Sequence, residues 1–296
     1  MQMKQFALIG PTASGKTTLA VMLAKKLDAV ILSLDSLSLY KEIDIASAKP
    51  TMEEREGILH FGIDILSPDA SFDVTTYIAL YQEALSYAKR VDKTLIIVGG
   101  TGFYLKMLLE GISDLPAISP QSRIKTKQAL QNLTDSHAML AALDPKTMQQ
   151  IKPADRYRIE KALDIYFETG LTPSDYFAQH PPQPVIQEAL PLYQISIERT
   201  LLRERIAVRT ETMIEAGLID EVCLLERSYG RAPNSMKAIG IKETLAYLDG
   251  IYDKAALVKQ ISTHTAQLAK RQTTFNNSQF DVTFSGSAEE IYRQIC

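Results

Sequence analysis

The order of apolar and polar residues predicts alternating strands and helices over the first hundred positions. Short apolar runs at residues 6–9, 29–34 and 94–98 are typical of buried strands. Residues 18–27 and 75–89 instead carry their apolar side chains at helical spacing. Apolar strands that alternate with helices are typical of a parallel sheet with helices on both faces. We therefore predict an α/β fold.

A mostly helical segment interrupts this alternation. Two proline-bearing stretches, at residues 115–120 and 180–184, enclose it. Within it, residues 158–167 have the spacing of a helix, with Gly170 as its cap and Pro173 as its stop. We interpret the segment as a helical subdomain inserted into the α/β core.

The remainder of the chain is predicted to complete the core. Residues 192–197 are predicted to form a late strand, which we place in the same sheet, and the pattern from Thr200 onward is again mostly helical. We therefore divide the chain into three parts. They are the first part of the core (1–115), the inserted subdomain (116–190), and a strand with helices that completes the core (191–296).

The first predicted strand leads directly into a phosphate-binding loop. Residues 10–17 fit the pattern G-x-x-x-x-G-K-[ST] at every fixed position, between a strand and a helix. Backbone N–H groups of such a loop surround phosphate oxygens, and the following helix adds positive charge at its N-terminus. Lys16 supplies a full charge, and the Thr17 hydroxyl is expected to bind Mg²⁺. The predicted binding residues are Gly10, Pro11, Thr12, Ala13, Ser14, Gly15, Lys16 and Thr17.

Composition narrows the remaining choices. The net charge is −3, so any contact with RNA must use a local basic patch. Two cysteines, Cys223 and Cys296, form neither a disulfide framework nor a metal cluster, so we expect a cytoplasmic protein. We also expect no signal peptide and no membrane span. The four histidines lack metal spacing and are interpreted as structural or surface residues: His60, His137, His180 and His264.

Two further clusters of polar residues and glycines follow predicted strands. Asp35 ends the second strand, at the edge where open α/β sheets bind ligands, and we favour a general base or metal ligand over a helix cap. Residues 99–104 read G-G-T-G-F-Y after the third strand. Their glycines allow the backbone to approach a ligand, or they form a tight turn that carries Thr101. The absence of an aspartate there counts against ATP hydrolysis.

An arginine lies within an apolar helical stripe near the end of the chain. Leu202, Ile206, Arg209 and Met213 share one helix face. Arg209 therefore either reaches water or a buried carboxylate, or points at a pyrophosphate, and the sequence leaves both alternatives open. The nearby arginines are expected at a solvated or RNA-facing surface: Arg199, Arg203 and Arg205.

Taken together, these motifs resemble the tRNA dimethylallyltransferases, also called tRNA isopentenyltransferases. The family's G-P-T-[AG]-[SV]-G-K-[ST] is at 10–17, and its D-S-x-Q-x-Y is read as D-S-L-S-L-Y at 35–40. Its D-I-G-T-A-K-P is read as D-I-A-S-A-K-P at 44–50, and its G-G-T-[GM]-x-Y is at 99–104. Two later motifs complete the order, A-I-G-Y-K as A-I-G-I-K at 238–242 and L-A-K-R-Q at 268–272.

The chain departs from the family pattern in two places. Ser38 replaces a glutamine that normally helps to read the target base, which puts base recognition at this position in question. The family's R-Q-x-T-W-x-R is R-Q-T-T-F-N-N at 271–277, where Phe275 keeps an aromatic face and a basic residue is lost. We interpret both changes as divergence within one activity.

The resemblance implies a reaction, its partners and the roles of several residues. A dimethylallyl group passes from its diphosphate to the exocyclic amine of the adenosine just 3′ of the tRNA anticodon. Lys16, Arg209 and Mg²⁺ on Thr17 would stabilise the leaving diphosphate. Asp35 would accept the amine's proton, and Thr101 would hydrogen-bond nearby. The inserted subdomain would grip the anticodon stem-loop of a monomeric enzyme. The resemblance assigns tRNA contacts to Asp35, Ser36, Leu37, Ser38, Thr101 and Arg123.

Two other classes of protein remain as alternatives. A small-molecule or nucleotide kinase shares the phosphate loop and an aspartate after the second strand, but it does not require the motifs at 99–104 and 268–272. A nucleotide-dependent switch that binds GTP should carry N-K-x-D, which this sequence lacks. A non-catalytic RNA-binding module belongs with the switch in the second, non-enzymatic class.

Overall fold

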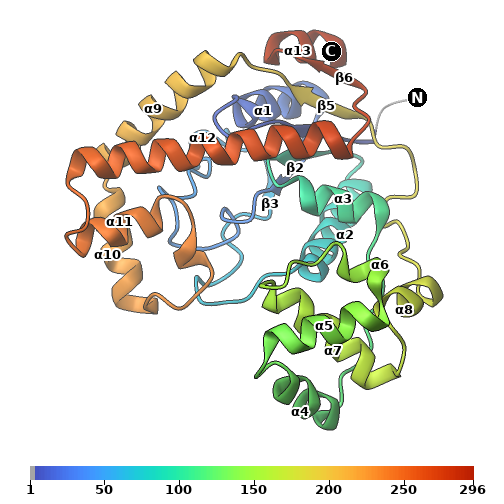
Figure 1. Ribbon diagram of the computed structural model, residues 1–296. Helices are drawn as coiled ribbons and strands as arrows, with labels where there is room; N and C mark the ends of the chain where they lie inside the picture. The colour runs from blue at the N-terminus through green and yellow to red at the C-terminus, as the bar shows by residue number, and fades with distance from the viewer. Residues whose placement is uncertain (1–3) are drawn as a thin grey trace. The chain divides into compact units, whose positions relative to one another are not determined.

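A six-stranded parallel sheet forms the centre of the computed structural model, which describes residues 4–296. The strand order is β3-β2-β4-β1-β5-β6, and every neighbouring pair is parallel. The predicted α/β class is confirmed (Figure 1). The strands are β1 (Gln5–Ile9), β2 (Ala29–Leu34), β3 (His60–Phe61), β4 (Thr94–Gly99), β5 (Leu192–Ile195) and β6 (Phe284–Gly286).

Strand length decided which strands were predictable. β1, β2 and β4 have five or six residues each, nearly all buried, which gives each a continuous apolar run. β3 and β6 have two and three residues, too few to produce a pattern, and both were missed. β5 ends at Ile195, two residues before the predicted end at Ile197.

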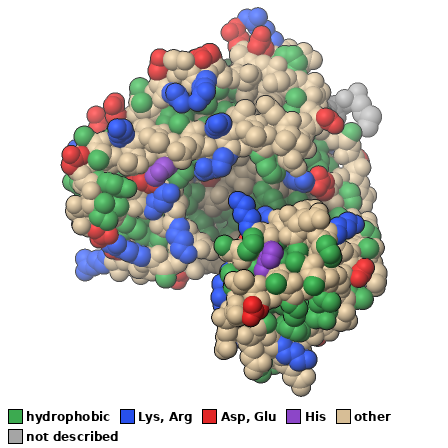
Figure 2. Space-filling view, viewed as in Figure 1, with side chains coloured by type: hydrophobic (Ala, Val, Ile, Leu, Met, Phe, Trp, Pro, Cys, Tyr) green, Lys and Arg blue, Asp and Glu red, His purple; other side chains and the backbone are tan. Residues whose placement is uncertain are grey.

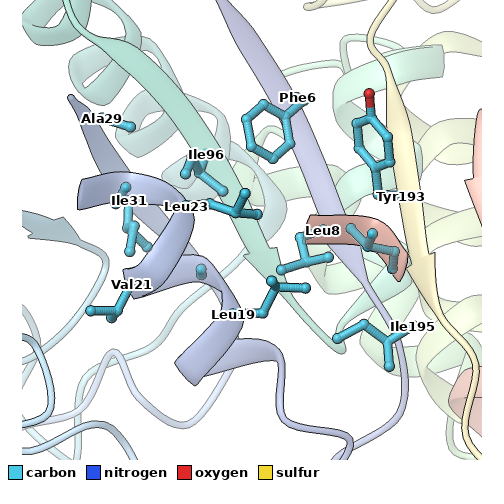
Figure 3. Close-up of a cluster of buried hydrophobic side chains, with 13 residues drawn as sticks. Phe6, Leu8, Leu19, Val21, Leu23, Ala29, Ile31, Ile96, Tyr193 and Ile195 are labelled. Carbon is cyan, nitrogen blue, oxygen red and sulfur yellow. The ribbon is translucent and has the colours of Figure 1, made fainter. Parts of the chain in front are cut away.

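Two helices cover one face of the sheet and enclose its main core. α1 (Lys16–Leu27) and α13 (Ala288–Ile295) contact each other and the strands. Figure 3 shows Leu19 and Leu23 of α1 directed at Leu8 of β1, among other apolar side chains that are almost fully buried. A third helix, α2 (Val74–Arg90), packs on β2 and β4, where Tyr77 is completely buried. These layers hold the ends of the central strands in place.

A second group of helices follows β5, as the pattern from Thr200 predicted. Its apolar cluster joins the loop after β2 to the C-terminal helices, through Tyr40, Ile43, Leu218 and Ile261. Glu221 strengthens this junction, because its carboxylate accepts three backbone N–H groups from residues 44–46. The elements are α9 (Arg199–Glu215), α10 (Leu218–Tyr229), η1 (Ser235–Lys237), α11 (Ile241–Leu248) and α12 (Lys254–Gln279).

The chain divides into two compact units. One consists of residues 1–108 and 186–296, and the other of residues 109–185. The second unit is thus an insertion between α3 and β5, with boundaries that differ by five to seven residues from the 116–190 assigned on proline content. The helix α3 (Gly102–Glu110) leads into this unit. The helices within it are α4 (Pro120–Ala129), α5 (Leu133–Leu143), α6 (Pro145–Met148), α7 (Arg156–Thr169) and α8 (Pro173–Gln179).

The inserted unit has an apolar core of its own. Leu140, Ile159 and Leu163 are buried at its centre. The predicted cap of α7 is confirmed, because Gly170 adopts a left-handed backbone with φ 72°. Pro173 lies beyond the end of α7 but also begins α8, where its missing N–H group costs no hydrogen bond.

Candidate active site

A cavity of about 400 Å³ opens where β1, β2 and β4 end. The carboxyl ends of parallel strands are the usual ligand site of an open α/β sheet. Most of the wall comes from the phosphate loop, the turn after β4, the loop after β2, and two C-terminal helices. The polar lining residues that carry the argument are Thr12, Ser14, Lys16, Thr17, Asp35, Ser38, Lys49, Arg205, Arg209 and Gln272.

The phosphate loop has the backbone that its glycines predict. Gly10 and Gly15 have φ values of 154° and 92°, and Ala13 is also left-handed at 61°. A Cβ at Gly10 would lie 3.2 Å from both the Cβ atom and the carbonyl oxygen of Ile195. Residues 12–17 line the cavity, whereas Gly10 and Pro11 lie outside its wall.

One buried hydroxyl in the loop lacks a partner. Ser14 is 3% exposed, and its Oγ atom has no hydrogen-bond partner among residues 4–296. Burying an unpaired hydroxyl costs about 1–3 kcal/mol. A phosphate oxygen at the loop would supply the missing partner.

Lys16 is the first residue of α1, near the end of the loop, and it donates a hydrogen bond to the Pro11 carbonyl oxygen at 2.5 Å. The pKa of Lys16 is lowered to about 7, chiefly by burial, while the Asp35 carboxylate opposes this shift and the nearby Arg209 guanidinium contributes to it. An ammonium group that is this poorly solvated is stabilised by an arriving anion. The loop is therefore arranged to gain from binding phosphate.

Two arginines of α9 reach the same loop. Arg209 Nη1 lies 3.4 Å from the Thr12 hydroxyl, and burial lowers the pKa of this guanidinium. Of the two alternatives left open for Arg209, the cavity position favours the one directed at an anion, although Asp35 also contributes a nearby negative charge. Arg205 is exposed, as expected, and it also lines the cavity, with its Nη1 atom 3.5 Å from the Ser14 carbonyl oxygen.

Asp35 lies in the loop directly after β2 and faces the cavity. Its Oδ1 atom accepts hydrogen bonds from the N–H groups of Leu37 at 2.8 Å and Ser38 at 3.1 Å. This is a local turn cap, although no helix follows. The second carboxylate oxygen makes no hydrogen bond to the rest of the described chain. Ser38 lines the cavity, whereas Ser36 and Leu37 do not.

The turn after β4 carries Thr101 to the same place. The Thr101 N–H group donates to the Leu34 carbonyl oxygen at 3.1 Å, which ties this residue to the end of β2, next to Asp35. Gly99 and Gly100 line the cavity, whereas Thr101 is half-buried and is not part of its wall. The structure thus brings Asp35 and Thr101 to neighbouring strand ends.

The glycines of this turn have a different role from the close ligand approach that we considered. A Cβ at Gly99 would lie 2.2 Å from the Leu34 carbonyl oxygen, and one at Gly100 would lie 2.3 Å from the Gln272 amide nitrogen. A Cβ at Gly102 would meet Asn276 and Phe275 at 2.7 Å. The protein's own strand and helix therefore occupy the space, and the tight-turn interpretation is the better one.

Two cavity residues come from motifs to which the sequence assigned no role. Lys49, whose side chain is 5% exposed, donates to the Tyr40 carbonyl oxygen at 3.0 Å and pairs with Asp44 and Asp64. Gln272 accepts the Thr12 N–H group at 2.8 Å. Both belong to motifs that match the family pattern, A-K-P and L-A-K-R-Q. Those motifs are the signal by which the sequence could have identified the two residues.

Arg123 lies in the inserted unit, exposed on α4, with its Nε atom 3.4 Å from the Ile118 carbonyl oxygen. His60, which we interpreted as a structural or surface residue, lines the cavity, and its Nδ1 atom lies 2.8 Å from the Ile58 carbonyl oxygen. Burial lowers the pKa of His60. Across residues 4–296, no three acidic, histidine or cysteine side chains gather as metal ligands.

Surface charge in this structure is mixed. Figure 2 shows basic and acidic side chains spread over the visible face.

Among the helices that the structure describes, none is long and apolar enough to cross a bilayer.

Known proteins provide an independent comparison. Residues 38–279 match the family model of IPP transferase. The chain is 62% identical over 288 residues to the tRNA dimethylallyltransferase of Sulfurovum sp. (strain NBC37-1), covering 97% of this chain and 96% of that protein. It is 52% identical over 289 residues to the tRNA dimethylallyltransferase of Sulfurimonas denitrificans, covering 98% and 97%.

A solved structure agrees with these sequences. The full-length tRNA isopentenylpyrophosphate transferase of Bacillus halodurans superimposes with a TM-score of 0.72 at 31% identity, covering 99% of this chain and 95% of that one. The resemblance inferred from the motifs is confirmed. The chain belongs to the IPP transferase family, that of the tRNA dimethylallyltransferases.

Proposed function

We propose that this protein transfers a dimethylallyl group from dimethylallyl diphosphate to tRNA, at the exocyclic N6 amine of the adenosine 3′ to the anticodon. The observation that carries the proposal is the shared cavity, in which a complete phosphate loop adjoins an aspartate at a neighbouring strand end. Family membership supports the same reaction.

The donor half of the site would hold the diphosphate. Amides of residues 13–17 and the unpaired Ser14 hydroxyl would receive its oxygens. Lys16, Arg205 and Arg209 would neutralise its charge, most strongly as the bond to carbon breaks. Three cations around one leaving group suit a reaction in which negative charge grows on diphosphate.

Magnesium fits this donor half with few protein ligands. Thr17 is an exposed hydroxyl on the cavity wall, and hydroxyl, diphosphate and water oxygens form the hard donor set that Mg²⁺ prefers. We propose that Thr17 holds the ion. When bound, Mg²⁺ would contribute charge neutralisation at the diphosphate.

The acceptor half would bring the adenine amine beside Asp35. The N6 lone pair attacks C1 of the dimethylallyl group, the C1–O bond breaks, and diphosphate takes the bonding electrons. N6 then loses a proton, which the Asp35 carboxylate accepts. Thr101, tied to the end of β2, would hydrogen-bond to the base.

The base must leave its stack to enter a cavity of this size. We propose that the inserted unit grips the anticodon stem-loop, with Arg123 as one contact. Ser36, Leu37 and Ser38 would contact the base or its neighbours. Ser38 has a shorter reach than the family's glutamine, so other groups must provide part of the base recognition. We propose that the active enzyme is a cytoplasmic monomer.

One assay separates this function from that of a kinase. Purified protein is incubated with total tRNA and Mg²⁺, together with either labelled dimethylallyl diphosphate or γ-labelled ATP. The proposal requires label on tRNA from the first donor only. Transfer from ATP, to tRNA or to a small molecule, would contradict it, and nucleoside analysis of the product would identify the modified atom.

A further inference from the structure

Gln272 contacts both halves of the proposed site. It lies on α12, far along the chain from the phosphate loop, yet its Oε1 atom accepts the Thr12 N–H group at 2.8 Å. Its amide nitrogen lies against Gly100, at 2.3 Å from the place a Cβ would occupy. Gln272 also lines the cavity. One side chain therefore bridges the loop of the donor half and the turn of the acceptor half.

Gly100 leaves room for this amide because it has no side chain. A real Cβ essentially never comes this close to a neighbouring atom, so a Cβ at position 100 would push the amide end of the Gln272 side chain aside. Thr12 is held on two sides, because its N–H group is bonded to Gln272 while its hydroxyl lies 3.4 Å from Arg209. The Gln272 amide is therefore hydrogen-bonded to the loop and packed against the turn.

We propose that Gln272 is a positioning residue that sets the distance between the bound diphosphate and the acceptor base. The proposal rests on the function proposed above. Displacement of reacting groups by about 1 Å can cost about a hundredfold in rate, even when both substrates still bind. Gln272 touches neither reacting atom in this account, and it acts through Thr12 and Gly100.

The test compares binding with transfer in Gln272→Ala. We expect the single-turnover transfer rate to fall about ten- to a hundredfold. Equilibrium binding of tRNA and of inorganic diphosphate should each change by less than about threefold, because Thr12 uses its N–H group on Gln272 and not on phosphate. Gln267→Ala is the matched control, since it removes the same side chain from an exposed position of the same helix.

A double-mutant cycle with Gly100→Ala separates positioning from general structural support. Gly100→Ala alone should slow transfer, because its Cβ displaces the amide. In the Gln272→Ala background that collision is gone, so Gly100→Ala should cost little more. Independent, multiplying losses would overturn the proposal, as would equal losses of binding and transfer. Normal transfer by Gln272→Ala would also overturn it, whereas an inactive wild-type protein would instead refute the proposed function.

Discussion

Lys16 illustrates how single side chains in the cavity are prepared for an anion. Its neighbours are another cation, a carboxylate and the Pro11 carbonyl oxygen, and it is largely removed from water. Such a lysine gains more from a bound diphosphate than an exposed one would, because little water has to be displaced.

Replacing Lys16 by alanine should impair chemistry more than folding. The ammonium group faces charge that grows as the diphosphate leaves, so its loss raises the barrier to transfer. We expect turnover to fall by about a hundredfold or more at saturating donor, with an unchanged circular dichroism spectrum. Near-normal turnover would contradict the assignment of this loop to the donor.

Diphosphate affinity should depend on pH near neutrality. Burial lowers the pKa of Lys16 to about 7 in the free protein, and a bound anion favours the charged form and raises it again. Binding therefore takes up a proton above pH 7, and affinity falls as the pH rises, whereas below pH 7 Lys16 is already charged. Calorimetry in two buffers of different ionisation enthalpy measures this uptake. Lys16→Arg, which stays charged, should lose this component.

Asp35→Asn should separate catalysis from recognition. The amide keeps the shape of the carboxylate and can still accept the N–H groups of Leu37 and Ser38, but it cannot take up a proton. We expect the single-turnover rate to fall about a hundred- to ten-thousandfold, with much smaller changes in tRNA binding. If binding collapses while the rate holds, Asp35 is a recognition residue or a turn cap.

At the scale of elements, the site depends on how closely the ends of β2 and β4 approach. β2 and β4 pair in register from Ala29 opposite Thr94 to Leu34 opposite Gly99. A turn or bend follows the carboxyl end of each strand. That closeness places the loop after β2 and the turn after β4 at one cavity wall. A side chain between the two strands would therefore disturb both.

Gly99→Ala tests this packing. Its Cβ would lie 2.2 Å from the Leu34 carbonyl oxygen, so the strands must separate. We expect the free energy of unfolding to fall by about 1–3 kcal/mol or more, measured by urea denaturation. Gly57→Ala is the control, because a Cβ there meets no atom within 4 Å and only its left-handed backbone costs about 1–2 kcal/mol. An equal or smaller loss at Gly99 would contradict the packing argument.

At the scale of the whole molecule, the net charge of −3 is a poor match for a polyanionic substrate. Binding of tRNA must then depend on a few well-placed cations, distributed over both compact units. Arg123 belongs to the inserted unit and Arg203 to the main one. The contribution of each arginine to tRNA affinity should be measurable from how that affinity depends on salt concentration.

The affinity for tRNA should fall linearly on a logarithmic salt scale. Removing one phosphate contact, by Arg123→Ala or Arg203→Ala, should flatten the slope by about one unit. Filter binding between low and moderate salt measures the slope. Lys93→Ala is the control. Lys93 lies just before the amino end of β4, whereas the cavity is at the carboxyl ends of the strands, and Lys93 pairs with Asp28. Salt-independent binding would contradict the account.

The sequence by itself determined the α/β class, the phosphate loop, the central strands and the family. These are local properties, because apolar runs, glycine positions and motif order are written along the chain. The same local reasoning left the two shortest strands unpredicted, since β3 and β6 are defined by pairing rather than by pattern. It also placed both boundaries of the insertion several residues too late in the chain. The proline-bearing stretches that were used to place them do not coincide with the residues where one compact unit ends and the other begins.

Only the tertiary structure decided which distant residues meet in the cavity. Arg205 and Arg209 reach the phosphate loop from α9, and Gln272 reaches it from α12. It also decided that the glycines after β4 make room for Leu34 and Gln272. Contacts across such separations arise from the packing of helices on the sheet, and no spacing along the chain encodes them. The phosphate-loop motif is therefore a local feature of the sequence, whereas the cations and the amide around it are a product of the fold.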